Sequence, residues 1–221
     1  MRRRWKLAQP EIVCLTNGAF AENCYIVADP DSGEAVIVDP GEEADLFLRR
    51  ADSAGWTVKA VWLTHAHLDH ILGVEHVVRE TGAPIYLHPD DRDLYDRLGE
   101  QGKWMGLSPP PAPPPDFEMV PGEQVHIGGF SFEIRHVPGH SPGSVALVGH
   151  GLALVGDALF AGSVGRVDLP GGDGETLLRS IREELLSLPD ETTVYSGHGP
   201  ATTVGHERAT NPFLTGAYPL V

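Results

Sequence analysis

Short apolar runs recur along this 221-residue chain and are separated by turn-forming residues. Ten of them are rich in valine, isoleucine and aromatic residues and are bounded by glycine, proline, aspartate or asparagine, a pattern typical of β-strands. They span residues 11–15, 23–28, 35–39, 58–64, 84–88, 124–127, 130–137, 144–148, 152–155 and 192–195. Glycine and proline together supply 45 residues. So much turn-forming sequence predicts many short elements and argues against a helical bundle.

Segments with helical character lie between some of these strands. They cover residues 43–54, 71–81, 89–98 and 174–188, and stop signals follow three of them at Gly55, Gly82 and Pro189. Helices alternate with strands in the first half of the chain, whereas strands cluster between about residues 124 and 155. This order predicts an α/β protein with two mixed, mostly antiparallel sheets and helices outside them.

The charge and the apolar content restrict the partners of the protein. Sixteen basic residues face 31 acidic ones, which gives a formal net charge of −15. This balance argues against nucleic acid or an anionic membrane surface as a partner, because both attract clustered positive charge. No stretch of about 18 apolar residues is present, so no membrane-spanning helix is expected. The N-terminal segment 1–15 is basic overall but lacks an apolar run of signal-peptide length, which indicates a cytoplasmic protein. Cys14 and Cys24 are therefore expected to be reduced thiols in the core.

The densest chemical signal is the sequence THAHLDH at residues 64–70, with three histidines and one aspartate in six positions. His65, His67 and Asp69 alternate, so an extended backbone directs their side chains to one side. His70 follows at the turn into the next helix. Neutral imidazoles and a carboxylate suit Zn²⁺, Fe²⁺ or Mn²⁺. The alternative interpretation is a polar strand end with solvated histidines. It is disfavoured because it does not explain why four titratable side chains lie so close together in the sequence.

Four more candidates, Asp39, His140, Asp157 and His198, each follow a predicted strand. If those strands share sheets, their ends meet at one rim. A catalytic zinc keeps about three protein ligands and leaves one position for water. Two metals roughly 3.5–4 Å apart would hold a hydroxide between them as nucleophile. One division of the ligands is His65, His67 and His140 for the first metal, Asp69, His70 and His198 for the second, and Asp157 as a bridge.

The motifs THAHLDH, PGHSPG around His140, GDALF at Asp157 and SGHG at His198 resemble those of the metallo-β-lactamase fold superfamily. The resemblance extends from the VDPG that contains Asp39 to the NPF at residues 211–213. It implies an αββα sandwich with two divalent metal ions at one edge, zinc first and iron or manganese as alternatives. It also implies that Asp39 lies behind the histidine loop and orients ligands. Asp39 and Asp69 are the candidate catalytic carboxylates.

Two longer segments, GDALFAGSVGRVDLPGGD and SGHGPATTVGHERATNPF, are similar to glyoxalase II (hydroxyacylglutathione hydrolase) and its short single-domain relatives. That resemblance implies hydrolysis of an acyl thioester such as a hydroxyacylglutathione. A thiolate leaves without a proton because thiols ionise near pH 8.5, whereas an amide nitrogen would need a general acid. Glyoxalase II proper carries a helical C-terminal extension that binds glutathione. Since this chain ends at Val221, soon after NPF, we expect one domain over residues 1–221 without that extension.

Other chemistries stay open or are disfavoured. A mononuclear iron persulfide dioxygenase of the same superfamily shares the ligand set and has an Arg-x-Asp stretch that Arg166 and Asp168 resemble. These two residues form either an ion pair or a substrate contact. The GHSPG at residues 139–143 matches a nucleophile elbow around Ser141. Pro142 follows the serine and has no N–H for an oxyanion hole, which excludes a serine hydrolase.

Several remaining segments are expected to have supporting roles. The proline-rich segment 108–115 should be an extended surface connector. The loop 17–23 either borders the pocket or is an ordinary hairpin loop. Structural or solvated roles are expected for the histidines outside the motifs, which are His76, His88, His126, His136, His150 and His206.

Overall fold

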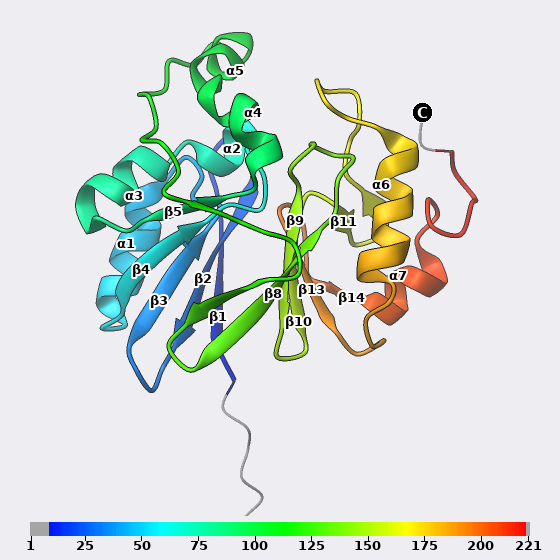
Figure 1. The fold of residues 1–221 in the computed structure, drawn as a ribbon, viewed down its shortest axis with the longest axis horizontal. Helices are drawn as coiled ribbons and strands as arrows, with labels where there is room; N and C mark the ends of the chain where they lie inside the picture. Colours follow the sequence, from blue (N-terminus) through cyan, green and yellow to red (C-terminus); the bar gives the residue numbers. More distant parts are fainter. Residues whose placement is uncertain (1–8, 220–221) are drawn as a thin grey trace, which may run out of the picture.

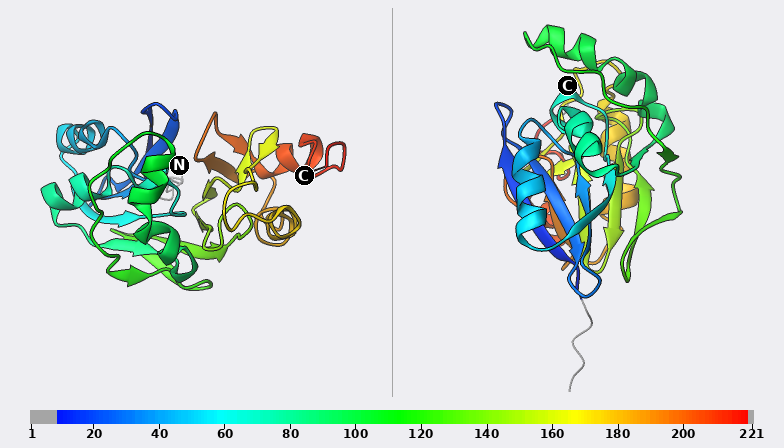
Figure 2. Two further views of the ribbon diagram at one scale, coloured as in Figure 1. Left: turned by 90° about the horizontal axis from the view of Figure 1, so that it is seen from above. Right: turned by 90° about the vertical axis from the view of Figure 1, so that its left-hand side faces the viewer.

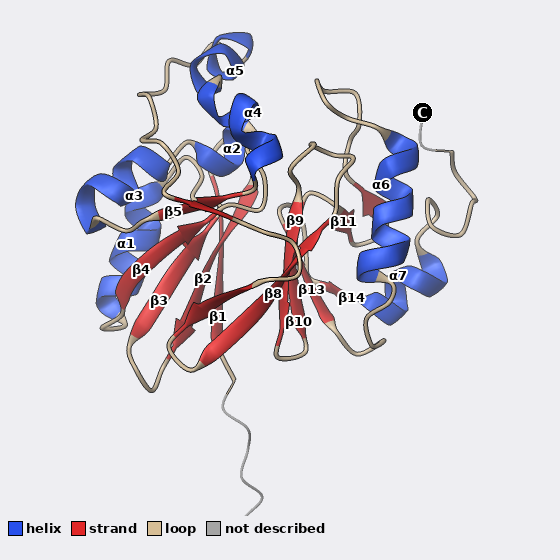
Figure 3. Ribbon diagram, viewed as in Figure 1, coloured by secondary structure: helices blue, strands red, loops and turns tan. Residues whose placement is uncertain are grey.

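Two six-stranded sheets face each other, and helices cover their outer sides (Figure 1). This arrangement comes from a computed structural model that describes residues 9–219. The basic residues 1–8, which contributed to the expected cytoplasmic location, lie outside the described residues. Among the described residues, no helix has the length and apolarity needed to cross a membrane. The predicted αββα sandwich is confirmed (Figure 3).

The first sheet combines antiparallel and parallel pairing. Its strands β1 to β3 pair antiparallel, whereas β3–β4, β4–β5 and β5–β6 pair parallel. Helices α1 (Ala44–Ser53) and α3 (Val74–Thr81) carry the chain back between the parallel strands, as parallel pairing requires. The strands, in sheet order, are β1 (Glu11–Asn17), β2 (Glu22–Asp29), β3 (Glu34–Val38), β4 (Thr57–Trp62), β5 (Ile85–Leu87) and β6 (Phe117–Glu118).

Antiparallel pairing dominates the second sheet, where only β10 and β13 run parallel. The expectation of mostly antiparallel sheets therefore holds for this sheet and is wrong for the first, because helical crossovers there join successive strands. In sheet order the strands are β14 (Thr202–Thr203), β13 (Thr193–Ser196), β10 (Leu152–Gly156), β9 (Val145–Gly149), β8 (Phe130–His136) and β7 (Gln124–Ile127). A separate hairpin pairs β11 (Leu159–Phe160) with β12 (Ser163–Val164).

The helix predicted over residues 71–81 is divided into α2 (Leu68–Ile71) and α3. Gly73 lies between them, and its N–H donates to the carbonyl of Pro40 at 2.9 Å. A Cβ at this position would lie 2.3 Å from the oxygen of Gly41. Glycine therefore allows the histidine segment to approach the chain that follows β3.

The helix predicted over residues 43–54 forms the single helix α1, whereas the other two predicted helices are divided into shorter pieces. Residues 89–98 form a 3₁₀ turn, η1 (Pro89–Asp91), and α4 (Arg92–Asp96), and a further helix, α5 (Leu98–Trp104), extends beyond the predicted end. Residues 174–188 form α6 (Gly174–Ser180) and a π-helical turn, η2 (Ile181–Leu185). The helix α7 (Val204–Thr210) was not predicted; Thr203 caps its first turn by accepting the N–H of His206. In the side view, α4 and α5 lie beyond the strand ends (Figure 2).

Apolar side chains fill the space between the sheets and under the helices. Trp62 from the first sheet meets Phe132 from the second, with ring centroids 5.8 Å apart, and both are fully buried. Cys24 is buried as expected, but Cys14 is exposed. The expectation of two core thiols is thus wrong for Cys14, which lies on the edge strand β1.

Replacing Trp62 with alanine should lower the free energy of unfolding by about 3–5 kcal/mol, because the loss leaves a cavity between the sheets. Urea unfolding of the two proteins measures this difference. Val120→Ala, at an exposed position, is the control and should change stability by less than about 0.5 kcal/mol. Equal stabilities of the two variants would contradict the packing described here.

Candidate metal centre

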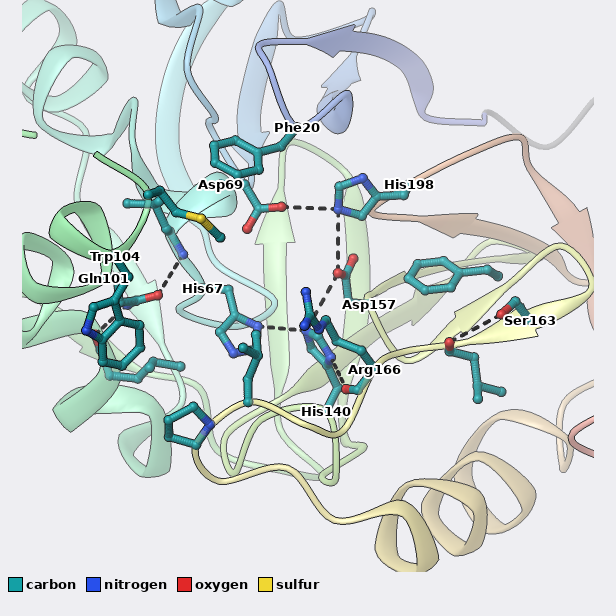
Figure 4. A pocket seen from close by; sticks show the side chains of 17 residues that line it. Phe20, His67, Asp69, Gln101, Trp104, His140, Asp157, Ser163, Arg166 and His198 are labelled. Atoms are coloured by element: carbon teal, nitrogen blue, oxygen red, sulfur yellow. Dashed lines mark hydrogen bonds and ion pairs between the residues drawn. The ribbon is translucent and has the colours of Figure 1, made fainter. Parts of the chain in front are cut away.

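The seven predicted ligands and Asp39 come together at one rim of the sandwich. Each follows the end of a strand: Asp39 follows β3, residues 65–70 follow β4, His140 follows β8, Asp157 follows β10 and His198 follows β13. The ligand-bearing loops belong to both sheets, so the site lies where the two sheets meet. Figure 4 shows five of these side chains around the cavity.

Three histidines form the first cluster, and one nitrogen of each lies within 4.8 Å of the others. His67 Nδ1 is 2.7 Å from His140 Nε2, and His140 Nε2 is 3.3 Å from His65 Nε2. All three side chains are buried. Three imidazole nitrogens directed at one point match the ligands that zinc takes in catalytic sites.

Asp69, His70 and His198 form the second cluster, again with ligand atoms within 4.8 Å of one another. The Oδ2 atom of Asp69 lies 3.2 Å from His198 Nε2 and 3.6 Å from His70 Nε2. Asp69 and His198 line the cavity, whereas His70 is fully buried beneath them.

Asp157 lies between the two clusters. Its Oδ2 is 3.6 Å from His140 Nε2 of the first cluster and 3.6 Å from His198 Nε2 of the second. Its Oδ1 is 3.4 Å from His70 Nε2. One carboxylate thus faces histidines of both clusters, as the bridging position requires.

Buried atoms without partners test whether a metal fits here. Within the described part of the chain, His70 Nε2 and Asp157 Oδ1 are buried and have no hydrogen-bond partner. An unpaired buried polar atom is costly, and each one needs an explanation. A divalent cation between this nitrogen and this oxygen would satisfy both, so the donor set fits a metal.

Hydrogen bonds on the far side of three imidazoles orient their free nitrogens. The Nδ1 atoms of His70, His65 and His140 lie 3.2 Å from Asp39 Oδ2, 3.0 Å from Thr64 Oγ1 and 2.8 Å from the carbonyl oxygen of Arg166. A proton on Nδ1 leaves Nε2 with a lone pair for a metal. Asp39 lies behind the ligands, as the resemblance implied, and has an uncommon φ of +51°.

The protonation states of two histidines and two carboxylates suit metal binding. Burial and the neighbouring imidazoles lower the pKa of His65 well below its ordinary value and lower the pKa of His67 to about 3. Burial alone would raise the pKa of Asp69 and Asp157, but the adjacent His70 outweighs it and lowers both. Burial alone would lower the pKa of His70 and His198, but Asp69 and Asp157 outweigh it and raise both. Neutral imidazoles and ionised carboxylates are the forms that bind metals, so a metal would displace a proton from these two histidines.

Comparison with known proteins connects this geometry to a family. The sequence profile of the Metallo-beta-lactamase superfamily matches residues 17–198, which include both clusters and Asp39. The chain belongs to the metallo-β-lactamase superfamily. It is 40% identical over 208 residues to hydroxyacylglutathione hydrolase GloC of Haemophilus influenzae, covering 92% of this chain and 97% of that protein.

Two solved structures of metallo-β-lactamase-fold proteins are also similar. The first, TTHA1623 in a di-iron-bound form, is 42% identical with a TM-score of 0.85 and covers 91% of this chain and 100% of its own. The BLEG-1 B3 metallo-β-lactamase is 39% identical with a TM-score of 0.87 and covers 93% of this chain and 100% of its own. The superfamily binds divalent metals, and the residues at the rim provide two candidate positions for them.

The cavity next to the candidate metal ligands has a volume of about 420 Å³. Two of the features whose roles the sequence analysis left open, the loop 17–23 and Arg166, contribute to its lining. Phe20 lines it, so the loop 17–23 borders the pocket. Arg166 also lines it and makes a two-bonded ion pair with Asp168, at 2.7 Å for each bond.

Ser141 is held in a structural position. It is fully buried, and its Oγ lies 2.8 Å from Asp91 Oδ2 and 2.7 Å from Ser144 Oγ. These contacts occupy the hydroxyl and agree with the exclusion of a serine hydrolase.

Asp91 is a functional residue that the sequence analysis missed. Its Oδ2 accepts the N–H of Ala66 at 2.8 Å and the hydroxyl of Ser141, and its Oδ1 accepts the N–H of Gly143 at 2.6 Å. The buried carboxylate therefore fastens the loop of His65 and His67 to the loop of His140. Its position just after the strand 84–88 was the available signal, because Asp39 and Asp157 follow strands in the same way.

Asn23 is a second residue that the sequence analysis missed. Its Nδ2 donates to the carbonyl oxygens of Ser196 and Gly199 at 3.0 and 2.8 Å, and its N–H donates to that of Gly197 at 2.6 Å. These bonds hold the loop that carries His198 against β2. Asn23 begins a predicted strand, and no local pattern distinguishes it from an ordinary strand residue.

His88 and His136 lie outside the cavity and form a third histidine group with Asp90. Their rings stack with centroids 4.4 Å apart and planes at 12°. Nearly parallel rings direct their nitrogen lone pairs alongside one another, not toward a common point. The structural role expected for these histidines agrees with this packing.

Replacing Asp39 with asparagine should weaken metal binding by about 10–100-fold. The asparagine presents to His70 Nδ1 either an amide nitrogen, which is a competing donor, or an oxygen without negative charge. Competition with a chelator measures the affinity. Asp52→Asn, at an exposed position on α1, is the control and should bind as the unaltered protein does. Unchanged affinity in Asp39→Asn would contradict the orienting role.

Replacing Asp91 with asparagine should destabilise the protein by about 1–3 kcal/mol, because an amide cannot accept all three hydrogen bonds. It should also lower metal affinity, since the two histidine loops lose their common anchor. Urea unfolding and chelator competition measure the two effects. Asp90→Asn at the neighbouring exposed residue is the matched control, and an equal result for both variants would contradict the role of Asp91.

Proposed function

We propose that this chain is a binuclear metal-dependent hydrolase of acyl thioesters. The observation that carries the proposal is the position of Asp157, whose two oxygens lie 3.4–3.6 Å from histidines of both clusters. In this proposal two divalent metals, zinc or iron, occupy the centre. The ligands are His65, His67 and His140 for one metal, Asp69, His70 and His198 for the other, and Asp157 for both.

A thioester fits the groups that surround the cavity. Among the described residues that line it, every histidine and carboxylate is one of the seven proposed metal ligands. No separate side chain is thus available to protonate a poor leaving group such as an amine, whereas a thiolate needs no proton. The name of the similar GloC protein, hydroxyacylglutathione hydrolase, denotes thioester hydrolysis and supports the same reaction.

The residues have separate tasks in this proposal. When bound, the metals would supply a nucleophile from water and polarise the thioester carbonyl. Asp39 holds His70 in place from behind. Asp69 reaches the cavity with an ionised carboxylate beside His198 and would hold the second metal together with it. The backbone carbonyl of Arg166 keeps His140 turned toward the centre.

The proposal is tested by measuring metal content and thioester hydrolysis together. The protein is loaded in the presence of zinc, iron and manganese, and we expect close to two metals per chain and release of thiol from S-lactoylglutathione. One iron per chain with oxygen uptake on glutathione persulfide would establish the oxidoreductase alternative instead. Two bound metals without hydrolysis of any thioester would contradict the proposed reaction.

Replacing Asp157 with alanine should remove at least one metal per chain and lower thioester hydrolysis by about 100-fold or more, because both metals lose a shared ligand. Metal analysis and a thiol-release assay measure the two effects. Asp45→Ala, at an exposed position on α1, is the control. Full metal content in Asp157→Ala would disprove the bridging role.

A further inference from the structure

One wall of the cavity is apolar and partly open to solvent. Leu68, Leu94, Trp104 and Met105 line the cavity on the side of α4 and α5, and Phe20 and Phe160 line it elsewhere. Trp104 is 68% exposed and Met105 is 54% exposed. Large exposed apolar side chains at the mouth of a pocket mark a binding surface. Figure 4 shows Trp104 beside Gln101 on one side of this cavity.

The polar side chains of the cavity outside the metal clusters have their hydrogen bonds within the protein. Gln101 accepts the N–H of Leu68 at 3.0 Å and donates to the carbonyls of Ala66 and Leu94 at 3.0 and 2.9 Å. Arg166 is the one lysine or arginine among the described lining residues, and Asp168 balances its charge. The walls therefore offer no free cation to a substrate carboxylate.

The apolar wall has a fixed position relative to the metal ligands. The bonds of Gln101 to Ala66 and Leu68 join α5 to the loop that carries His65 and His67. Trp104 lies three residues later on the same helix, one turn from Gln101. The proline-rich segment supports both helices from outside: Pro109 lies against Gly102 of α5, and the hydroxyl of Tyr95 of α4 donates to the carbonyl of Pro113 at 2.7 Å.

We infer that the substrate is a thioester with an apolar chain, and that this chain lies against Leu94, Trp104 and Met105. The inference rests on the proposed function and narrows its substrate class. Glutathione carries carboxylates, and neither the cavity walls nor a chain with a net charge of −15 favours them. The apolar chain is attached either to the carbonyl or to the sulfur, and both attachments use the same contact with the wall.

Two series of thioesters test the inference on the metal-loaded protein. In the first, acyl chains from acetyl to octanoyl are joined to N-acetylcysteamine; in the second, acetyl is joined to alkyl thiols of increasing length. We expect kcat/KM to rise about fourfold for each added methylene in one series, and that series identifies the attachment. S-Lactoylglutathione should be a poorer substrate than the best long-chain thioester. A flat response in both series would overturn the inference.

The variant Trp104→Ala tests the wall itself. It should lower kcat/KM about tenfold for the longest chain and leave that for the acetyl substrate unchanged, so the dependence on length becomes shallower. Phe117→Ala is the matched control, because Phe117 is an exposed aromatic residue that stacks on Tyr86 outside this cavity. An equal loss for all substrates in Trp104→Ala would show a purely structural role and overturn the inference.

A binding measurement separates failure of this inference from failure of the proposed function. An octyl thioether cannot be hydrolysed, so calorimetry reports its binding without turnover. We expect binding with a negative heat-capacity change, weakened about tenfold in Trp104→Ala. Binding without hydrolysis of any thioester would contradict the proposed function alone, whereas hydrolysis of short thioesters without binding of the thioether would contradict the apolar chain alone.

Discussion

The three hydrogen bonds of the Asp91 carboxylate join the loops on which the candidate site depends. His65 and His67 follow a strand of the first sheet, and His140 follows a strand of the second. Packing between sheets fixes their spacing only approximately, whereas metal coordination requires ligand positions within about 0.5 Å. Asp91 supplies this accuracy for one pair of loops. Asn23 does the same for the loop of His198, so two short polar side chains set the geometry of the rim.

The same rim concentrates groups that are unfavourable to bury together. Imidazoles and carboxylates fill it, and His70 Nε2 and Asp157 Oδ1 have no hydrogen-bond partner among the described residues. Buried charges are retained in proteins when they are paired or coordinate metals. The proposed metal pair would thus contribute to the stability of the folded chain as well as to its chemistry. Asp39, with its left-handed backbone, shows that the local chain conformation also serves the ligands.

The sequence analysis predicted the fold class and the candidate ligands. The ligands could be identified because four of them are closely spaced at residues 65–70 and the others each follow a predicted strand. It did not predict Asp91 or Asn23, since a carboxylate at a helix start and an amide in a strand have ordinary local roles. It also missed the break at Gly73 and the short strands at the sheet edges, which depend on contacts between distant segments. The single-domain boundary and the cytoplasmic location stay predictions.

The wall of the cavity and the metal ligands come from different parts of the chain. The wall segment, α4, α5 and the proline-rich stretch, is inserted between β5 and β6, and β6 is an edge strand. Changes in its length or sequence need not disturb the sheets or the rim, provided that Gln101 keeps its bonds to the histidine loop. Ligand preference can therefore diversify during evolution, or be redesigned by exchanging residues 92–115, while the candidate metal centre stays as it is.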